Sequence, residues 1–493
     1  MTGRFSAVRV VSGVGAGLVL VLLLLVVVRL PWIGDLGMHA ATVERLRHSL
    51  TDPGNPLVDA DTPSPYYSPW TVLLGCLARV SGWSVFVVLR VGAVVALGVL
   101  GSGVWRWVRT LSGRGVAVPL VFLCLVLLWG WVPFDWSGLL GLESLALTVA
   151  YPSVLALGLA FHLWAWVGRV VRGSVGWGAG VGLGVLWAVV LLCHQFSGVV
   201  ASLGALAVVV AGRPGGRVLA RLGVGVLVGV GVLWVWPYYD FFALFGAGSA
   251  LEAVHRPLYA GLGARLWLVG VVGVVALVVR GRRVGFGRDP LVVFFVLGML
   301  VFAAGGVTGH WSWGRVLPAV VIPAQVAVGV EVAEAAAVGR RVWVAGAALA
   351  LVVGAWAQVG AVGFVVGRGV LPGWVEAKYR EPWEGYHWIT RWVGYGDVVM
   401  ARRVPSREIP AYGAYTVVPG YPDFFLSDEG AREGAVRAYF ARGAGGGVRK
   451  GILEEYGVRW VVDRGRGSSL RGDAGLREVG RGPRGEVLYA VVR

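Results

Sequence analysis

The sequence predicts an α-helical polytopic membrane protein that ends in a small α/β domain. Hydrophobic residues make up 57% of its 493 residues and charged residues only 14%, with a mean hydropathy of +0.73. This composition exceeds what one water-soluble core can bury. Apolar runs long enough to cross a bilayer recur as far as residue 367. Beyond it, charges become frequent and apolar runs shorten to strand length.

The apolar runs predict about eleven transmembrane helices. The first run has no small-residue cleavage site, so we expect an uncleaved helix rather than a signal peptide. A further stretch, 138–150, is a candidate re-entrant segment. The expected spans are 8–29, 83–105, 116–132, 151–168, 175–193, 198–212, 219–236, 264–280, 290–305, 316–338 and 342–367.

The arginines of the connecting loops indicate how the chain is oriented. With a cytoplasmic N-terminus, arginines cluster in the inner loops while the short outer loops hold almost none, as the positive-inside rule requires. This places the first large loop and everything after residue 368 outside the plasma membrane. The net charge of +17 therefore reflects orientation in the lipid bilayer and not a nucleic-acid partner. The inner arginines are Arg106, Arg109, Arg114, Arg169, Arg172, Arg213, Arg217, Arg221, Arg280, Arg282, Arg283, Arg288, Arg340 and Arg341.

The segment 369–493 is expected to form an extracytoplasmic α/β domain, separate from a transmembrane domain of residues 1–368 with a large first outer loop at 30–82. Short apolar stretches indicate buried strands, and stretches with helical spacing alternate with them. The glycines at 443–447 follow a helix, which disfavours a phosphate-binding loop there. The strands are expected in 396–404, 414–420, 458–463 and 486–492, and the helices in 427–443 and 448–457.

The first outer loop carries carboxylates and histidines directly at the membrane exit. Apolar residues recur at helical spacing over Met38–Leu50, which predicts a helix along the outer interface. Asp35 and His39 are four positions apart, so they share one face if the helix begins at or just before Asp35. Prolines keep the following stretch irregular, and this stretch carries Asp59 and Asp61. Carboxylates on such a loop can activate a substrate hydroxyl.

Each of these acidic residues also has an ordinary structural interpretation. Asp35 is suited to cap the N-terminus of the predicted helix. Asp59 and Asp61 are typical of solvated loop charges. The loop alone therefore leaves both interpretations open.

Two arginines and one histidine near the membrane are further candidates for binding substrate. Arg90 lies within a span, where a guanidinium either faces a partner or polar cavity, or snorkels to the outer interface. His194 falls at the outer end of a span, where it either contacts substrate or hydrogen-bonds a neighbouring helix. Arg315 lies at an outer helix start and suits an anionic headgroup.

Several stretches of the sequence together resemble the GT-C superfamily of membrane glycosyltransferases. This superfamily includes protein O-mannosyltransferases, aminoarabinose transferases and mycobacterial arabinosyltransferases. The likeness begins with "GDLGMHAATVERL", "SPYYSPW" and "LLGCLARVSGWSVFVVLRVGAVVALGVLG" and continues with "YPSVLALGLA", "LLCHQFSGVVASLGAL", "WPYYDFF" and "WGRVLP". It covers most of residues 1–340.

The resemblance implies transfer of a sugar from a polyprenyl-phosphate-linked donor to a glycan, lipid or protein acceptor on the outer face of the membrane. The products would be cell-envelope glycans or glycoproteins. It gives Asp35 the role of general base toward the acceptor hydroxyl. Arg90 and Arg315 would neutralise charge on the departing phosphate. The remaining substrate-binding candidates are His39, Asp59, Asp61 and His194.

The sequence departs from this superfamily in its acidic positions. Many members carry paired acids in the first loop, whereas Leu36 follows Asp35 here. A later acidic position binds metal in the oligosaccharyltransferase branch, and only Asp135 or Glu143 could correspond to it. Neither lies in a DxD motif, so we expect no obligatory metal and no other cofactor. The three cysteines lie in apolar runs without CxxC spacing and indicate neither disulfides nor a metal site.

Two other classes of protein share parts of this pattern. A polytopic transporter should show matched halves with broken helices, but no internal repeat is visible in the sequence. A non-catalytic envelope protein, or a polymerase or ligase of lipid-linked glycans, would have the same topology. The sequence leaves these alternatives open.

Overall fold

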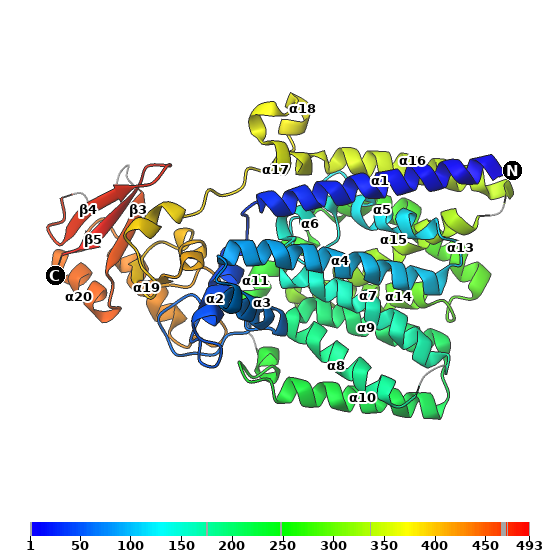
Figure 1. Cartoon of the computed structure of the whole chain (residues 1–493), viewed down its shortest axis with the longest axis horizontal. Coiled ribbons are helices and arrows are strands. Elements are labelled where there is room, and N and C mark those ends of the chain that lie inside the picture. The colour runs from blue at the N-terminus through cyan, green and yellow to red at the C-terminus, as the bar shows by residue number, and fades with distance from the viewer. Residues whose placement is uncertain are drawn as a thin grey trace. The chain divides into compact units, whose positions relative to one another are not determined.

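The computed structural model describes residues 2–173, 176–246, 249–335, 337–464, 470 and 472–492. These residues are mainly helical, with one sheet near the C-terminus (Figure 1). The chain divides into two compact units. We call the first, which comprises Met1–Pro31, Arg90–Trp236 and Gly248–Pro382, the helical unit. We call the second, which comprises Trp32–Leu89, Pro237–Ala247 and Trp383–Arg493, the mixed unit.

A helix lies at each predicted span, and the chain is a multi-pass membrane protein. Among the described residues, eight helices are long and apolar enough to cross a membrane. The bent pair Arg341–Ala357 and Val359–Val366 makes nine if it forms one span, and α5 and α8 are apolar but shorter. The number eleven stays a prediction. The helices are α1 (Thr2–Arg29), α4 (Val85–Leu111), α5 (Ala117–Leu127), α7 (Pro152–Val171), α8 (Gly178–Cys193), α9 (Gln195–Gly212), α10 (Gly216–Trp234), α12 (Leu262–Leu268), α13 (Val274–Val284), α14 (Pro290–Thr308), α15 (Leu317–Glu334) and α16 (Ala337–Ala357).

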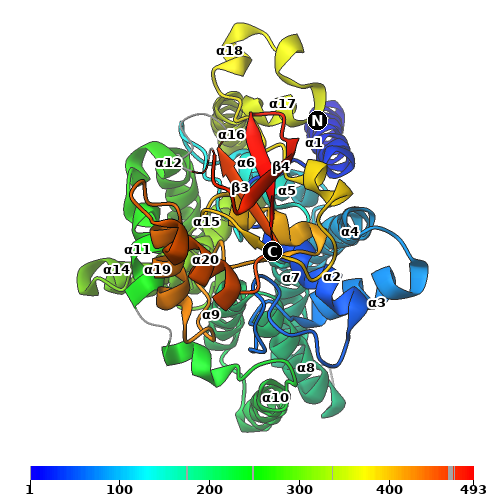
Figure 2. The same ribbon diagram turned by 90° about the vertical axis from the view of Figure 1, so that its left-hand side faces the viewer.

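Helix α15 forms the centre of the helical unit, with its membrane span wholly buried. Helices α5, α13 and α14 pack against it. A Cβ atom on Gly329 of α15 would lie 2.7 Å from the backbone nitrogen of Val121, so only glycine allows this approach of α5. Helices α8 and α10 lie side by side in a second packed pair, and Figure 2 views α10 nearly end-on.

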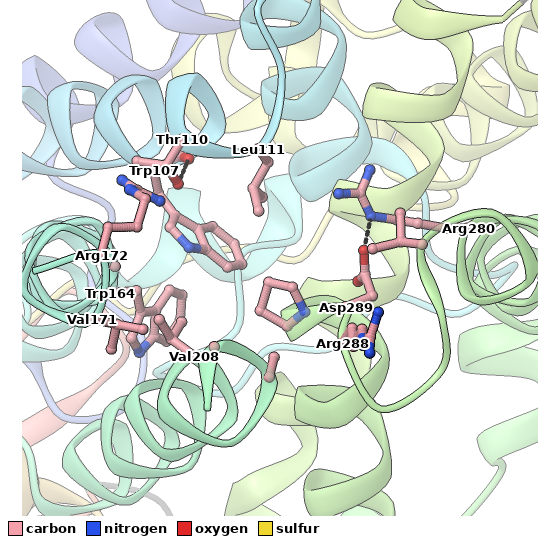
Figure 3. Close-up of a pocket in the computed structure, with 15 residues that line it drawn as sticks. Trp107, Thr110, Leu111, Trp164, Val171, Arg172, Val208, Arg280, Arg288 and Asp289 are labelled. Atoms are coloured by element: carbon pink, nitrogen blue, oxygen red, sulfur yellow. Dashed lines mark hydrogen bonds and ion pairs between the residues drawn. The ribbon is translucent and has the colours of Figure 1, made fainter. Parts of the chain in front are cut away.

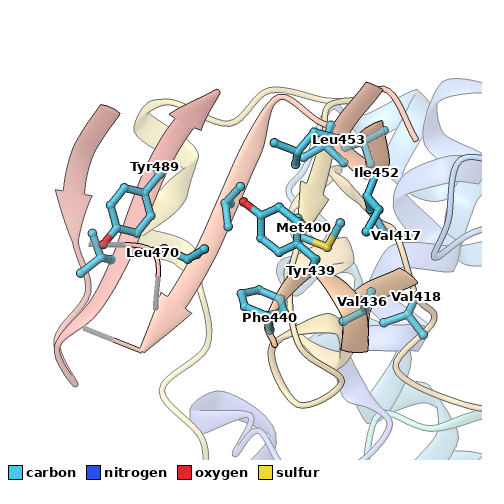
Figure 4. Packing of buried hydrophobic residues seen from close by; sticks show 14 residues of the cluster. Met400, Val417, Val418, Val436, Tyr439, Phe440, Ile452, Leu453, Leu470 and Tyr489 are labelled. Carbon is cyan, nitrogen blue, oxygen red and sulfur yellow. The ribbon is translucent and has the colours of Figure 1, made fainter. Parts of the chain in front are cut away.

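The mixed unit contains a five-stranded sheet in the order β2-β1-β3-β5-β4. The first three strands in this order run parallel, and β5 runs antiparallel to both of its neighbours. Helices α19 (Glu429–Tyr439) and α20 (Gly446–Glu455) contribute Tyr439, Ile452 and Leu453 to the core that covers the sheet (Figure 4). The strands are β1 (Val398–Met400), β2 (Tyr415–Thr416), β3 (Trp460–Arg464), β4 (Leu476–Arg481) and β5 (Glu486–Val491).

The four predicted strands and both predicted helices of this segment are present, which confirms the α/β class. Strand β4 is an addition that the sequence did not signal. It is an edge strand in which no residue is buried, and it carries the exposed residues Arg477, Glu478 and Arg481. Charges on an edge strand discourage pairing with other chains, but they also remove the apolar pattern by which buried strands are recognised.

Helix α2 (Leu36–His48) begins where the sequence predicts, but it does not lie along an interface. Ten of its 13 residues are buried, because it packs against α3 (Pro69–Ser81) and against the short helix Ile409–Tyr412. A Cβ atom on Gly37 would lie 2.0 Å from the carbonyl oxygen of Arg407, so the first turn of α2 fits only with glycine there. The amphipathic interpretation of this helix is therefore wrong.

Helix α3 was not predicted, although its boundaries have clear local causes. Ser68 and Thr71 form a capping box at its start, and Pro69 occupies its first position. Gly82 ends it in a left-handed conformation, with φ of 71°.

Arg45 fastens α2 to the C-terminal part of the mixed unit. Its side chain is fully buried, with 0% exposure. The guanidinium donates to the carbonyl oxygens of Gly413 at 3.0 Å and Ala414 at 2.9 Å. Its central carbon lies 3.6 Å from the ring centre of Tyr415 and 4.8 Å from that of Tyr395. A charged group can stay in this interior because it is both hydrogen-bonded and stacked on aromatic rings.

We expect Arg45→Met to destabilise the mixed unit by about 2–4 kcal/mol, because it removes two charge-assisted hydrogen bonds and leaves two carbonyl groups unsatisfied. The thermal midpoint of the purified protein and protease cleavage within 383–493 would measure the effect. Arg47→Met is the matched control, since Arg47 lies on the same helix with a partly exposed side chain. Equal stability of the two variants would contradict a structural role for Arg45.

Candidate functional site

The mixed unit brings two predicted site residues, Asp35 and His39, to the start of α2. The backbone amide of His39 donates to the carbonyl oxygen of Asp35 at 3.1 Å, so the two residues lie one helical turn apart as their spacing predicts. Asp35 occupies the N-cap position, but its side chain makes no capping hydrogen bond. The interpretation of Asp35 as the helix cap is therefore wrong, and its carboxylate is not used to begin the helix.

Two tyrosines lie close to Asp35 or to the backbone directly before it. Burial raises the pKa of Tyr66 well above its usual value, and the carboxylates of Asp423, Asp35 and Glu429 raise it further. Tyr66 is therefore a protonated hydroxyl close to these acids and can donate a hydrogen bond. The hydroxyl of Tyr421 donates to the carbonyl oxygen of Gly34 and so supports the backbone directly before Asp35.

The imidazole of His39 is held neutral. Its side chain is 8% exposed, and burial lowers its pKa to about 3. At neutral pH it therefore carries no charge with which to attract the Asp35 carboxylate. His39 can instead orient a neighbouring group by hydrogen bonding or packing.

Asp59 and Asp61 lie exposed on the irregular loop, and in the described part of the chain neither forms an ion pair. The loop is fixed by Asn55, whose side-chain oxygen accepts from the amides of Leu57 at 2.9 Å and Val58 at 3.2 Å. The Asn55 amide group in turn donates to Asp423 at 2.7 Å. Asn55 thus shapes the loop, while Asp59 and Asp61 extend from it into solvent.

The helical unit brings together two other predicted residues, His194 and Arg315. The guanidinium of Arg315 lies 3.3 Å from Nε2 of His194 and 2.9 Å from the hydroxyl of Ser137. A guanidinium can only donate, so Arg315 is the donor in its contact with Nε2. Nδ1 accepts from the backbone amide of Ser197 at 3.2 Å and lies 2.8 Å from the Ser197 hydroxyl, so His194 caps the start of α9 and its ring is held in place.

Aromatic rings and a carboxylate position Arg315. Its central guanidinium carbon lies 4.8 Å from the ring centre of Phe196 and 5.4 Å from that of Trp136. Glu252 accepts from the amide of Ser312 at 2.8 Å and from its hydroxyl at 2.6 Å. This contact holds the short helix Trp311–Val316, which carries Arg315. We call Arg315, His194, Ser137, Trp136 and Phe196 the arginine cluster.

Arg90 has a different setting from the arginine cluster. Its side chain donates to the carbonyl oxygen of Val28 at 3.0 Å, near the C-terminal end of α1. Carbonyl groups of a final helical turn lack partners within their own helix, and a cation there satisfies one of them. This contact gives Arg90 a structural role in joining α4 to α1.

The two later acidic residues are both engaged within the helical unit. Asp135 is ion-paired with Arg380. Glu143 lies buried in the short helix α6 (Leu142–Thr148), and burial together with the nearby Asp135 raises its pKa to about 7. Among the described residues, no three His, Cys, Asp or Glu side chains are placed to hold a metal ion.

Sequence reasoning missed the residues that position these groups. Trp136 and Ser137 directly follow Asp135, and Phe196 lies two positions after His194. Their closeness in sequence to these candidates could have indicated that they lie near the site. Asn55 and Asp423 are separated by 368 positions, and no local pattern links them.

The membrane-spanning helices, together with a small sheet near the C-terminus, give this chain the fold of two solved membrane glycosyltransferases, which agrees with the fold that the resemblance to the GT-C superfamily predicted. No protein-family model matches the sequence, and no curated protein matches it.

Two solved structures support this conclusion about the fold. The chain is similar to the arabinofuranosyltransferase AftD from Mycobacteria, with 14% identity and a TM-score of 0.57 over 98% of this chain and 40% of AftD. It is also similar to the oligosaccharyltransferase of Archaeoglobus fulgidus in its apo form, with 13% identity and a TM-score of 0.51 over 91% of this chain and 69% of that one. Our chain thus spans about 40% of the length of AftD, and the similarity concerns the fold alone.

We expect His39 to make the mixed unit sensitive to acid. Its pKa is about 3 in the folded protein and 6.5 in the unfolded chain, so the unfolded chain binds the proton first. The stability contributed by neutral His39 is present above pH 6.5 and is lost as the pH falls toward 3. His39→Gln should therefore flatten the fall in thermal midpoint over this range, whereas His387→Gln, which changes an exposed histidine, should not. A wild-type profile in His39→Gln would contradict a buried neutral imidazole.

Proposed function

We propose that this protein is a glycosyltransferase that moves a sugar from a polyprenyl-phosphate-linked donor to an acceptor hydroxyl on the outer face of the plasma membrane. The observation that carries the proposal is the Asp35 carboxylate, which lies at the start of a buried helix without serving as its cap. The GT-C fold supports the same class of reaction. The solved proteins with this fold transfer different sugars, so the proposal specifies neither the sugar nor the acceptor.

In the proposed reaction, Asp35 accepts the proton of the acceptor hydroxyl while the oxygen of that hydroxyl forms a bond to the anomeric carbon of the sugar. The bond between that carbon and the phosphate oxygen breaks, and polyprenyl phosphate leaves with the bonding electrons. His39 and Tyr66 would orient the carboxylate or the acceptor, since both are uncharged hydrogen-bonding groups. Asp59 and Asp61 are proposed to contact the acceptor from the exposed loop.

The arginine cluster is the proposed phosphate-binding element. A guanidinium presents several donors in a fixed plane and suits phosphate oxygens, and charge on the phosphate grows as the glycosidic bond breaks. Ser137 and His194 would hold the guanidinium of Arg315 in one orientation. Arg90 is retained as a weaker candidate, because its contact with α1 already explains its position.

The orientation of the chain is also a proposal, supported by the alternation of arginines between loops. It places the N-terminus in the cytoplasm and both the first large loop and the segment 369–493 outside. With this orientation, Asp35 faces the compartment in which envelope glycans are assembled. The division of the chain at residue 368 into a transmembrane and an extracytoplasmic domain belongs to the same proposal.

We expect Asp35→Asn to lower turnover by roughly 100-fold or more, because it keeps the size of the side chain but removes proton acceptance. The measurement is transfer of a radiolabelled sugar from a lipid-phosphate donor in reconstituted vesicles, normalised to folded protein. Asp59→Asn and Asp61→Asn are the matched controls on the same loop and should have smaller effects. Full activity in Asp35→Asn would remove this residue from the chemistry. Movement of labelled donor across the vesicle without sugar transfer would indicate a transporter instead.

We expect Arg315→Lys to raise the KM for the lipid-phosphate donor by about tenfold, because it keeps the charge but loses the planar set of donors. Arg256→Lys is the control, since Arg256 is an exposed arginine of the same unit that lies over Trp311. Donor titrations of the two variants in vesicles would separate KM from turnover. An unchanged KM in Arg315→Lys would exclude a phosphate contact by this side chain.

A further inference from the structure

The helical unit contains a cavity of about 230 Å³ that the proposed reaction does not use. Figure 3 shows Trp107 and Arg172 on one side of it and Arg280, Arg288 and Asp289 on the other. The lining comes from the last turns of α4, α7, α9 and α13 and from the start of α14. The cavity therefore lies where spanning helices end.

The acidic group of the cavity is already neutralised by neighbouring groups. One oxygen of Asp289 accepts from the Arg280 side chain at 2.5 Å, and the other accepts from the amides of Leu291 and Val292. Arg280 also lies 3.5 Å from Glu331, which pairs more closely with Arg283 at 2.6 Å. Arg283 also pairs with Glu334 at 3.0 Å, so the contacts of Arg283 are with Glu331 and Glu334, while Asp289 is paired with Arg280. This pairing weakens the repulsion between Asp289 and an incoming anion.

Two further arginines supply positive charge that no carboxylate balances. Arg172 and Arg288 both line the cavity and are exposed. Within the described ranges, neither guanidinium forms an ion pair or a side-chain hydrogen bond. Their donors are available to a ligand, and the buried side chains of Trp107 and Trp164 form part of the apolar lining.

The size and place of the cavity select the kind of ligand. Pockets for larger organic ligands usually have roughly 300–1,000 Å³, so this cavity suits a small headgroup rather than a nucleotide. Basic pockets between spanning helices, at the level where they leave the bilayer, bind phosphate-bearing lipid headgroups. We propose that this cavity binds the phosphate group of an anionic phospholipid, with Arg172 and Arg288 contacting the phosphate oxygens. This proposal does not rest on the proposed glycosyltransferase reaction.

The test compares two double variants that remove the same charge. Arg172→Gln with Arg288→Gln changes the cavity, whereas Arg217→Gln with Arg282→Gln changes exposed arginines outside its lining. Purified proteins would be titrated in uncharged detergent with phosphatidylglycerol or phosphatidylcholine, and bound lipid would be counted by native mass spectrometry. We expect the cavity variant to lose phosphatidylglycerol binding about 30-fold, as two arginine–phosphate contacts predict, and the control variant to lose less than about threefold.

A third variant separates the cavity from general surface charge. Val208→Phe keeps every arginine but places a larger side chain in the cavity, and it should weaken phosphatidylglycerol binding as strongly as the double variant. Addition of glycerol phosphate distinguishes the two sources of the phosphate, since effective competition at equal concentration would point to a soluble ligand rather than a lipid. Equal losses in the cavity and control double variants, or no preference of the wild type for phosphatidylglycerol, would overturn the proposal. Elution of each variant as a single species on size-exclusion chromatography verifies folding.

Discussion

The buried guanidinium of Arg45 is the interaction on which the mixed unit depends. It satisfies two carbonyl groups of residues 413–414 and lies over the rings of Tyr395 and Tyr415. A charge in the interior is expensive unless its partners hold fixed positions, so this contact tolerates little displacement of α2. Since Asp35 directly precedes α2, the place of the proposed base is determined by an arginine ten positions away that does not touch the chemistry.

In the helical unit the equivalent constraint is the need to satisfy backbone groups in an apolar surrounding. Helix α5 is short, and its end would leave carbonyl groups without partners. The side-chain amide of Gln358 donates to the carbonyl oxygen of Val126 at 2.9 Å, and that of Gln325 donates to Leu128 at 2.7 Å. The Gln358 side chain also accepts from the amide of Glu143 at 3.3 Å, and so connects α5 to α6. Two buried glutamines thus allow the chain to turn within the helical unit.

The sequence predicted those features that depend on local patterns. Apolar runs located the helices, and strands with buried faces were found from their composition. The spacing of Asp35 and His39 placed them one turn apart, because helical periodicity is a local property. What could not be predicted depends on long-range packing. The burial of α2 follows from Arg45 meeting Gly413, and the loop fold follows from Asn55 meeting Asp423, each across 368 positions. Strand β4 was not predicted because its residues, at the edge of the sheet, lack the alternating or continuous apolar pattern of a buried strand.

The separation between Arg45 and its carbonyl partners has a consequence for how the protein is made. A ribosome adds about 5–20 residues per second, so the 368 positions between Arg45 and Gly413 take on the order of 20–70 s to synthesise. Throughout this interval Arg45 must remain hydrated, and α2 can pack against α3 but not yet against the short helix Ile409–Tyr412. The first loop therefore emerges early but completes its structure last. Any factor that shields nascent hydrophobic segments would have to act on this loop until the final part of the chain has been translated.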